Sequence, residues 1–326
     1  MSWLNKQLIT KYGLVALSII IIIYSGYNII NIFSSISLKD VLASVKLIEF
    51  PAILASIFFA SISYLCLIGY DYTALKQANA RTSLSLMTLA SFSSYCICFN
   101  LGFPVVTGPA IRYWIYSREN VTPQQIVYVT SIISITFLLG LVMLLSIGMI
   151  MGAHDLANFY HYHPAWNIFI GVSIFVIIIM FLGWNSIKPR SINVRGYELT
   201  LPSNFFIVLQ LVLGGVEQAF ASASLYQLIP HTADINFYSF SVIYIFACTV
   251  GIISHSPGGL GVFEAAMMQA LPINAPQVIL AGLLLFRIVY YLLPFVITLV
   301  LLFNDQKSRQ WSGLRIALSN ILTLHK

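Results

Sequence analysis

Long apolar runs recur along the whole chain, and each is continuous rather than alternating between apolar and polar positions. Runs of about 20 apolar residues are long enough to cross a bilayer as helices. Continuous runs also exclude a membrane barrel, whose strands alternate. The pattern therefore predicts an all-α, polytopic integral membrane protein. Its full spans are predicted at residues 12–33, 48–70, 125–152, 166–187, 204–228, 236–254 and 277–303.

Two segments break this pattern. Residues 83–101 lie between Arg81 and Arg118, and both flanks should be cytoplasmic, so we predict that this segment enters the membrane, turns near residues 102–104 and returns as a shorter helix. The second, "SHSPGGLGVFEAAMMQALP" (254–272), must supply one further crossing if the basic tail is to end in the cytoplasm. The prediction is then about eight transmembrane helices plus a re-entrant hairpin, with broken helices in both halves.

The distribution of charge predicts the orientation. Only 8% of the residues are charged and 59% are hydrophobic, whereas soluble domains average roughly 25% charged residues. Loops 152–165 and 230–236 contain no Lys or Arg, which places them outside and both chain ends in the cytoplasm. Residues 1–303 would form the transmembrane domain and 304–326 a basic amphipathic tail on the inner surface. The predicted cytoplasmic clusters are Lys6 and Lys11; Lys76, Arg81, Arg112 and Arg118; Lys188, Arg190 and Arg195; and Lys307, Arg309, Arg315 and Lys326.

The glycine-rich break contains the first candidate site residues. Gly258, Gly259 and Gly261 allow turns that other residues avoid. A helix that starts near Gly261 would direct free N–H groups at an anion such as a phosphate. Glu264 falls in the first turn of that helix. Its role stays open between a cap on its own helix and a contact with a cationic headgroup or a proton.

A similar break occurs in the first half of the chain, in "NLGFPVVTGPAIRYW" (100–114). There Pro109 suits the first position of a helix, and Arg112 follows just inside it. Paired interruptions in the two halves indicate a transporter-type binding site at a repeat interface. Arg112 is therefore a candidate for binding the substrate.

Two further charges, Glu217 and Arg287, lie deep in predicted spans. A charge at this depth costs at least about 2.5–3.5 kcal/mol and so needs a partner or a wet cavity. One interpretation is a structural Glu217–Arg287 salt bridge. The other is that Arg287, with Tyr291 on the same helix face, binds a lipid phosphate or headgroup, because the guanidinium fork suits phosphate.

Other signals are weaker. His154, His161 and His163 have no evident fourth metal ligand, and His255, although it lies between two serines, has no carboxylate partner for hydrolysis. Because no nucleotide-binding loop or catalytic motif occurs, the sequence predicts no enzyme activity, cofactor, metal or nucleic-acid partner. A stripe of small residues, predicted to pack helices, comprises Gly214, Gly215, Ala219 and Ala223.

Five ordered segments between roughly residues 60 and 300 carry a family resemblance. They are "GYDYTALKQ" (69–77), "SYCICFNLGFPVVTGPAIRYWIYSREN" (94–120), "VEQAFASASLYQLIP" (216–230), "SPGGLGVFEAAM" (256–267) and "LLLFRIVYYLLPF" (283–295). These segments resemble the N-terminal flippase domain of the multiple peptide resistance factor family, the lysylphosphatidylglycerol synthetases and flippases, in the form of its stand-alone YbhN-type relatives.

The resemblance implies an eight-span flippase unit that forms dimers, moves aminoacylated phosphatidylglycerol outward and supports antimicrobial peptide resistance. In the full-length family a cytosolic domain makes this lipid. The chain ends directly after its last predicted span, so the resemblance implies transport without synthesis. A separately encoded synthase is then an expected partner.

The sequence thus favours a phospholipid translocase of the bacterial inner membrane that works without ATP hydrolysis. The arginines and the glycine-rich backbone would hold the lipid phosphate, and the glutamates would receive positive headgroup charge. Two alternatives stay open: a proton-coupled transporter of a small solute, and a non-transporting membrane partner of a lipid synthase. The predicted substrate-binding residues are Arg112, Glu217, His255, Gly258, Gly259, Gly261, Glu264, Arg287 and Tyr291.

Overall fold

The computed structural model describes residues 38–306, apart from residues 103, 188–190, 195–196, 201–202, 230–234, 255 and 272–274. The predicted first span (12–33) and residues 307–326 of the predicted basic tail therefore lie outside the described residues, whereas residues 304–306 belong to the last described helix. The long helices are α3 (Phe50–Gln77), α4 (Leu84–Leu101), α6 (Pro123–Met151), α8 (Ala165–Ile187), α9 (Asn204–Tyr226) and α10 (Phe237–Ile253), together with a helix over Pro276–Gln306 that begins as α12 (Pro276–Phe286). Shorter elements are α2 (Leu38–Leu47), α5 (Pro104–Tyr116), η1 (Ser117–Glu119), α7 (Ala153–Tyr160), η2 (Pro257–Gly259), α11 (Val262–Ala270) and η3 (Arg287–Leu292).

This architecture confirms a polytopic helical membrane protein. Six of the described helices are long and apolar enough to cross a bilayer: α3, α4, α6, α8, α9 and the continuous helix Pro276–Gln306, which contains α12 and η3. Two short antiparallel strands, β1 (Ser191–Val194) and β2 (Tyr197–Thr200), connect α8 to α9. The predicted external loop at 152–165 contains the helix α7.

Local sequence signals fix several helix starts. Thr122 caps α6 by accepting a hydrogen bond from the backbone N–H of Gln125, whose side chain bonds back to Thr122, and Pro123 occupies the first turn. Asn236 caps α10 by accepting a hydrogen bond from the N–H of Ser239. Both caps lie at the ends of long apolar segments, where free N–H groups would otherwise be unpaired.

The helices α4 and α5 form the predicted hairpin. Gly102 ends α4 with φ of +76°, a backbone conformation suited to glycine. The prediction that Pro109 starts the returning helix is wrong, because α5 already begins at Pro104 and Pro109 lies inside it. Pro104 fills the first helical position, and Pro109 removes one backbone donor from the second turn.

The segment 254–272 does not complete a crossing as predicted. At the start of α10, Ser239 Oγ donates a hydrogen bond to the carbonyl of Gly152, where α6 gives way to α7. At the end of α11, the hydroxyl of Tyr160, the last residue of α7, donates to the carbonyl of Ala270. Both ends of the α10–η2–α11 unit therefore lie beside α7, and α11 returns toward the end from which α10 came. This unit is a second hairpin.

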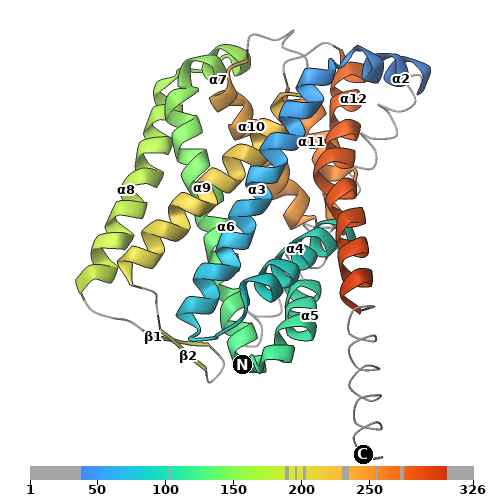
Figure 1. The fold of residues 1–326 in the computed structure, drawn as a ribbon. Coiled ribbons are helices and arrows are strands. Elements are labelled where there is room, and N and C mark those ends of the chain that lie inside the picture. Colours follow the sequence, from blue (N-terminus) through green and yellow to red (C-terminus); the bar gives the residue numbers. More distant parts are fainter. Residues whose placement is uncertain are drawn as a thin grey trace, which may run out of the picture.

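The two hairpins enter from opposite ends of the molecule. The helices α2 and α7 lie at one end, and β1, β2 and the base of the α4–α5 hairpin lie toward the other (Figure 1). An Arg118–Asp305 ion pair of 2.9 Å ties the end of α5 to the end of the Pro276–Gln306 helix. The order helix–hairpin–helix thus occurs twice, as α3, α4–α5, α6 and as α9, α10–α11, α12, with inverted direction. Inverted repeats of this kind are typical of secondary transporters.

Close helix packing holds this arrangement. The predicted small-residue stripe on α9 includes Gly214, which lies against Gly140 of α6 so tightly that a β-carbon on Gly214 would be 2.6 Å from the carbonyl oxygen of Thr136. This contact confirms that Gly214 serves helix packing. The helix α9 also packs along α3, so α9 joins the first repeat to the second.

Candidate functional site

The tips of the two hairpins meet inside the molecule. A β-carbon on Gly258, at the tip of the second hairpin, would lie 2.7 Å from the carbonyl oxygen of Phe99, at the end of α4. Asn100, the next residue of α4, donates hydrogen bonds to the carbonyls of Cys96 and Tyr291. The two interrupted segments that the sequence paired therefore contact each other and the helix that carries Arg287.

The glycine-rich tip has the predicted backbone. Gly258, Gly259 and Gly261 have φ of +60°, +65° and +79°, a region that side chains disfavour. The helix α11 begins at Val262, directly after Gly261, as predicted. Its N–H groups consequently point toward the place where the hairpins meet.

Glu264 has two roles at this tip. Its Oε2 accepts a hydrogen bond from the backbone N–H of Gly261 at 2.7 Å, which caps the first turn of α11. Its Oε1 accepts from Nε of Arg287 at 2.6 Å. The two side chains are 13% and 11% exposed, so the ion pair is largely shielded from solvent. The structure thus shows a capping residue that also pairs with a cation.

Arg287 joins the two sides of the glycine-rich tip. Besides its bond to Glu264, it donates from Nη1 to the carbonyl of Gly258 at 2.7 Å. Its Nη2 is buried and has no hydrogen-bond partner among the described residues. The guanidinium also lies 4.6 Å from the ring centre of Tyr291. Of the two interpretations of Glu217 and Arg287, the salt bridge between them is wrong, because Arg287 pairs with Glu264.

Arg287 begins a π-helical turn. This turn, η3, spans Arg287–Leu292 within a long apolar helix. Single π-turns inside α-helices occur frequently at functional sites, because the wider turn releases backbone groups. The carbonyl of Tyr291 accepts the bond from Asn100 described above. The turn is therefore tied to the tip of the first hairpin.

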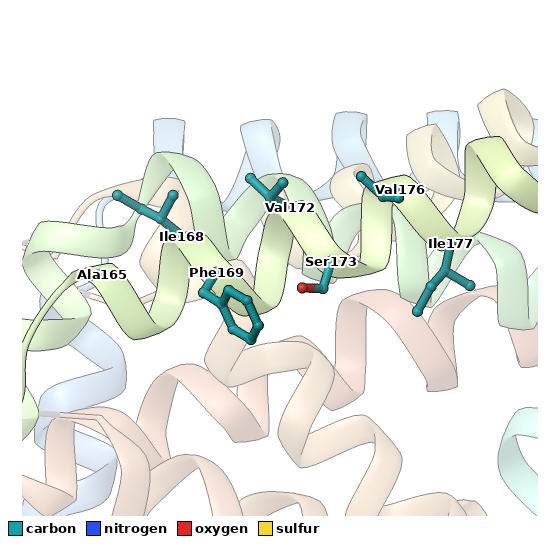
Figure 2. A pocket seen from close by; sticks show the side chains of 7 residues that line it. All are labelled: Ala165, Ile168, Phe169, Val172, Ser173, Val176 and Ile177. Atoms are coloured by element: carbon teal, nitrogen blue, oxygen red, sulfur yellow. The ribbon is translucent and has the colours of Figure 1, made fainter.

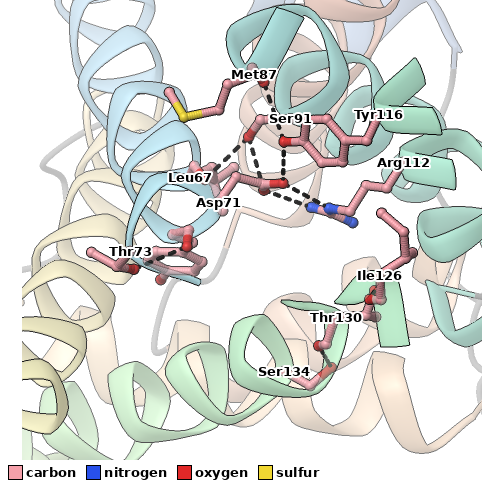
Figure 3. A network of polar contacts seen from close by, with 11 residues as sticks. Leu67, Asp71, Thr73, Met87, Ser91, Arg112, Tyr116, Ile126, Thr130 and Ser134 are labelled. Carbon is pink, nitrogen blue, oxygen red and sulfur yellow. Dashed lines mark hydrogen bonds and ion pairs between the residues drawn. The ribbon is translucent and has the colours of Figure 1, made fainter. Parts of the chain in front are cut away.

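Arg112 belongs to a separate buried cluster. It forms a two-point ion pair with Asp71, from Nε to Oδ1 and from Nη2 to Oδ2, each at 2.9 Å. Tyr116 and Ser91 donate further hydrogen bonds to the same carboxylate at 2.8 and 3.0 Å (Figure 3). Arg112 is 3% exposed and Asp71 is fully buried. Arg112 therefore lies in the protein interior and not, as the basic cluster implied, on an exposed loop.

Asp71 is a functional residue that the sequence pattern did not predict. The predicted span ended at residue 70, whereas α3 continues to Gln77 and places Asp71 inside the helix. A carboxylate that directly follows an apolar run, within "CLIGYDYTAL", could have marked it as an intramembrane charge. The Asp71–Arg112 pair joins α3 to α5, so it fixes the first hairpin against the rest of the protein.

Glu217 occupies a third cluster. Ser63 and Tyr290 donate hydrogen bonds to its Oε1 at 3.1 and 3.3 Å. Tyr70 and Gln218 donate to its Oε2 at 3.1 and 2.6 Å. Glu217 is 2% exposed. These partners come from α3, α9 and η3, and all of them are neutral.

A continuous row of aromatic rings connects the three clusters. The Arg112 guanidinium lies 4.8 Å from the ring centre of Tyr95. The rings of Tyr95 and Phe99 are 6.0 Å apart, and those of Phe99 and Tyr290 are 6.3 Å apart and stacked. Tyr290 reaches Glu217, and its neighbour Tyr291 reaches Arg287. The row runs along the end of α4, between the first hairpin and η3.

Other predicted features lie elsewhere. His255 is outside the described residues. Within the part of the chain that the structure describes, no three His, Cys, Asp or Glu residues are grouped to hold a metal ion. A hollow of about 610 Å³ is lined by α8 residues from Ala165 to Ile177, and Ser173 is the polar residue in this lining (Figure 2). An apolar hollow of this kind suits a lipid-facing surface.

Comparisons with known proteins match nearly the whole chain. The family model described as "Lysylphosphatidylglycerol synthase TM region" matches residues 13–298. An uncharacterized protein of Synechocystis sp. is 30% identical over 263 residues, which are 78% of this chain and 80% of that protein. Inner membrane protein YbhN of Escherichia coli is 24% identical over 301 residues, 91% of each chain.

The similarity also reaches a larger enzyme. Phosphatidylglycerol lysyltransferase of Staphylococcus xylosus is 26% identical over 294 residues, which are 87% of this chain and 33% of the lysyltransferase. The match is thus to the transmembrane third of that enzyme. The residues of this chain correspond to a membrane region and not to a catalytic domain.

Proposed function

The chain belongs to the family of the lysylphosphatidylglycerol synthase transmembrane region, and from this we propose that it moves an anionic or aminoacylated phospholipid between the leaflets of the bacterial inner membrane without ATP hydrolysis. The observation that carries the proposal is the buried Nη2 of Arg287, a donor with no hydrogen-bond partner among the described residues. Buried donors are nearly always paired in folded proteins, so this one calls for a ligand.

A lipid phosphate fits the free donor. The guanidinium presents its donors as a planar fork, and phosphate oxygens accept such donors strongly. The positive end of α11 lies beside the same group, because Gly261 and Val262 begin that helix next to the Arg287–Glu264 pair. Both contributions favour an anion at the meeting point of the hairpins.

An aminoacylated headgroup fits the pair as a whole. Such a lipid carries a phosphate and at least one ammonium group. In the proposed complex the Arg287–Glu264 ion pair opens, the phosphate binds Arg287 and an ammonium group binds Glu264. Each of the two side chains therefore keeps a partner of opposite charge. A lipid with a phosphate alone would leave Glu264 without full compensation. This argument favours the aminoacylated class.

Arg112 and Glu217 have different tasks in this proposal. Arg112 is paired at two points with Asp71 and positions the α4–α5 hairpin. Glu217 is saturated by neutral donors and touches no cation among the described residues. The headgroup site is therefore proposed at Arg287, Glu264 and the glycine-rich tip. In the same proposal both termini are cytoplasmic, the protein forms a homodimer, and a separate synthase supplies the lipid.

Translocation by the purified protein in proteoliposomes tests this function. Fluorescent analogues of phosphatidylglycerol and lysylphosphatidylglycerol are followed as a membrane-impermeant quencher removes the outer-leaflet signal. We expect Arg287→Lys to slow both lipids about tenfold, since a charged hydrogen bond is worth about 1.5–3 kcal/mol. We expect Glu264→Gln to slow the lysyl lipid more than phosphatidylglycerol.

Arg118→Lys is the matched control. Arg118 also forms an ion pair, with Asp305, but at the end of the helices and away from the hairpin tips. It should keep the wild-type rate. Wild-type vesicles that move lipid no faster than protein-free vesicles would refute the function, and an unaffected Arg287→Lys protein would refute the site.

A further inference from the structure

Glu217 differs from the other buried carboxylates of the described residues. Asp71 pairs with Arg112, and Glu264 pairs with Arg287. Glu217 has no such cation among the described residues, although it is only 2% exposed. An ionised carboxylate without a positive partner is strongly disfavoured in a setting of low polarity, whereas a neutral carboxylic acid is tolerated there. The surroundings of Glu217 therefore favour the uptake of a proton.

The partners of Glu217 can serve both protonation states. Ser63 and Tyr290 share a hydrogen bond of 2.7 Å in which either hydroxyl can donate. When the carboxylate is ionised, one hydroxyl donates to it, and the other donates either to the carboxylate or to the first hydroxyl. When it is protonated, its own O–H can donate to either hydroxyl oxygen, because a hydroxyl both donates and accepts. An arginine could not make this exchange, since it has no acceptor.

The titratable groups that face Glu217 come from every element packed around it. None of them carries a positive charge among the described residues. They are Cys66 and Tyr70 of α3, Tyr95 of α4, Tyr244 and Cys248 of α10, and Tyr290 and Tyr291 of η3. Thiols and phenols are ordinarily neutral at pH 7 whereas a carboxyl group is ordinarily ionised, so Glu217 is the one group of this cluster whose charge needs compensation.

We propose that Glu217 is a proton-binding site, and that its protonation is sensed by the π-helical turn η3 that carries Arg287. The physical link is short: Tyr290 donates to Glu217 and lies three residues after Arg287 in the same turn. Protonation of Oε1 reverses or breaks the hydrogen bond from Tyr290. The interaction that ties η3 to Glu217 is then weakened or changed in direction. The link to lipid movement rests on the proposed function, whereas the proton site does not.

Infrared difference spectroscopy of the reconstituted full chain tests the proton site directly. Lowering the pH should produce the C=O band of a buried carboxylic acid in the wild type, and Glu217→Gln should lose this band. The control is Glu49→Gln, which removes an exposed carboxylate at the start of α3 and should keep it. A band that persists in Glu217→Gln overturns the proposal.

If Glu217→Gln does not fold, the variant Tyr290→Phe provides a second infrared test of the proton site. Loss of the hydroxyl that bonds to Oε1 should change the frequency of the same band, because a C=O stretch depends on its hydrogen bonds. An unchanged frequency contradicts the assignment to Glu217.

Lipid translocation under an imposed pH gradient tests the coupling. Wild-type and Glu49→Gln proteins should change rate when the gradient is reversed, and Glu217→Gln should give one rate in both directions. Translocation that ignores both the gradient and the substitution overturns the coupling and leaves the proposed function intact. An infrared band that is present in the wild type and lost in Glu217→Gln, together with no lipid movement by the wild type, would instead refute the proposed function and leave the proton site standing.

Discussion

The carbonyl oxygen of Phe99 lies 2.7 Å from the position that a β-carbon on Gly258 would occupy. This is the contact between the two hairpin tips, and Gly258 also has φ of +60°. We expect Gly258→Ala to lower the free energy of unfolding by about 1–3 kcal/mol through overpacking and backbone strain. Thermal unfolding of the purified protein measures the loss.

Gly183→Ala is the matched control for that substitution. Gly183 lies in α8 with nothing within 4 Å of an added β-carbon. Alanine there should leave stability unchanged or raise it by roughly 0.5–1 kcal/mol, because glycine is unfavourable inside a helix. If Gly258→Ala unfolds at the same temperature as Gly183→Ala, the tips do not touch as described.

Removing one partner of the Asp71–Arg112 ion pair should strongly lower the free energy of unfolding. Asp71→Asn leaves a buried guanidinium without its counter-ion, and we expect a loss of about 3–5 kcal/mol. The double variant Asp71→Leu/Arg112→Met should be more stable than Asp71→Asn, since it buries no unpaired charge. Unfolding temperatures of the three proteins decide this, and a double variant less stable than the single one would contradict it.

The Arg118–Asp305 pair offers a comparison with a less buried ion pair. Its side chains are 15% and 23% exposed, against 3% and 0% for Arg112 and Asp71. Arg118→Ala should therefore cost about 1 kcal/mol or less. A loss as large as that of Asp71→Asn would show that burial does not set the cost.

The contact between α6 and α9 should reject side chains at Gly214. Gly214→Ala places a β-carbon 2.6 Å from the carbonyl oxygen of Thr136, which cannot move without shifting α6. Gly215→Ala brings its β-carbon 3.3 Å from the flexible side chain of Met143. We expect Gly214→Ala to cost about 1–3 kcal/mol and Gly215→Ala much less. Equal losses at the two positions would argue against the described crossing.

The capping role of Glu264 can be separated from its charge. Glu264→Gln keeps an oxygen that can accept from the N–H of Gly261, whereas Glu264→Ala removes the cap as well as the ion pair. We expect the alanine variant to be less stable than the glutamine variant by about 0.5–2 kcal/mol, the value of a helix cap. Identical unfolding temperatures would show that the cap contributes nothing.

The sequence predicted those features that depend on nearby residues. Continuous apolar runs located α3, α6, α8 and α9, and Gly102 located the first chain reversal. The spacing between Gly261 and Glu264 predicted the start of α11 and the possibility of a cap. Each of these signals acts within a few residues along the chain, where the physical rules of helix formation apply directly.

Contacts between segments that are far apart in the chain could not be predicted from the sequence. The partner of Arg287 is Glu264 and not Glu217, because η3 faces the second hairpin, and no spacing rule encodes that packing. The return of α11 was missed since the positive-inside rule reads Lys and Arg, and residues 254–275 contain neither. The extension of α3 past residue 70 hid Asp71.

One guanidinium holds both Gly258 and Glu264, and this sets a limit on how the chain can change length. Arg287 binds the Gly258 carbonyl with Nη1 and the Glu264 carboxylate with Nε. A single residue inserted between these two positions would rotate α11 by about 100°, since a helix has 3.6 residues per turn, and would turn Glu264 away. Insertions and deletions should therefore be excluded from this short stretch among related sequences.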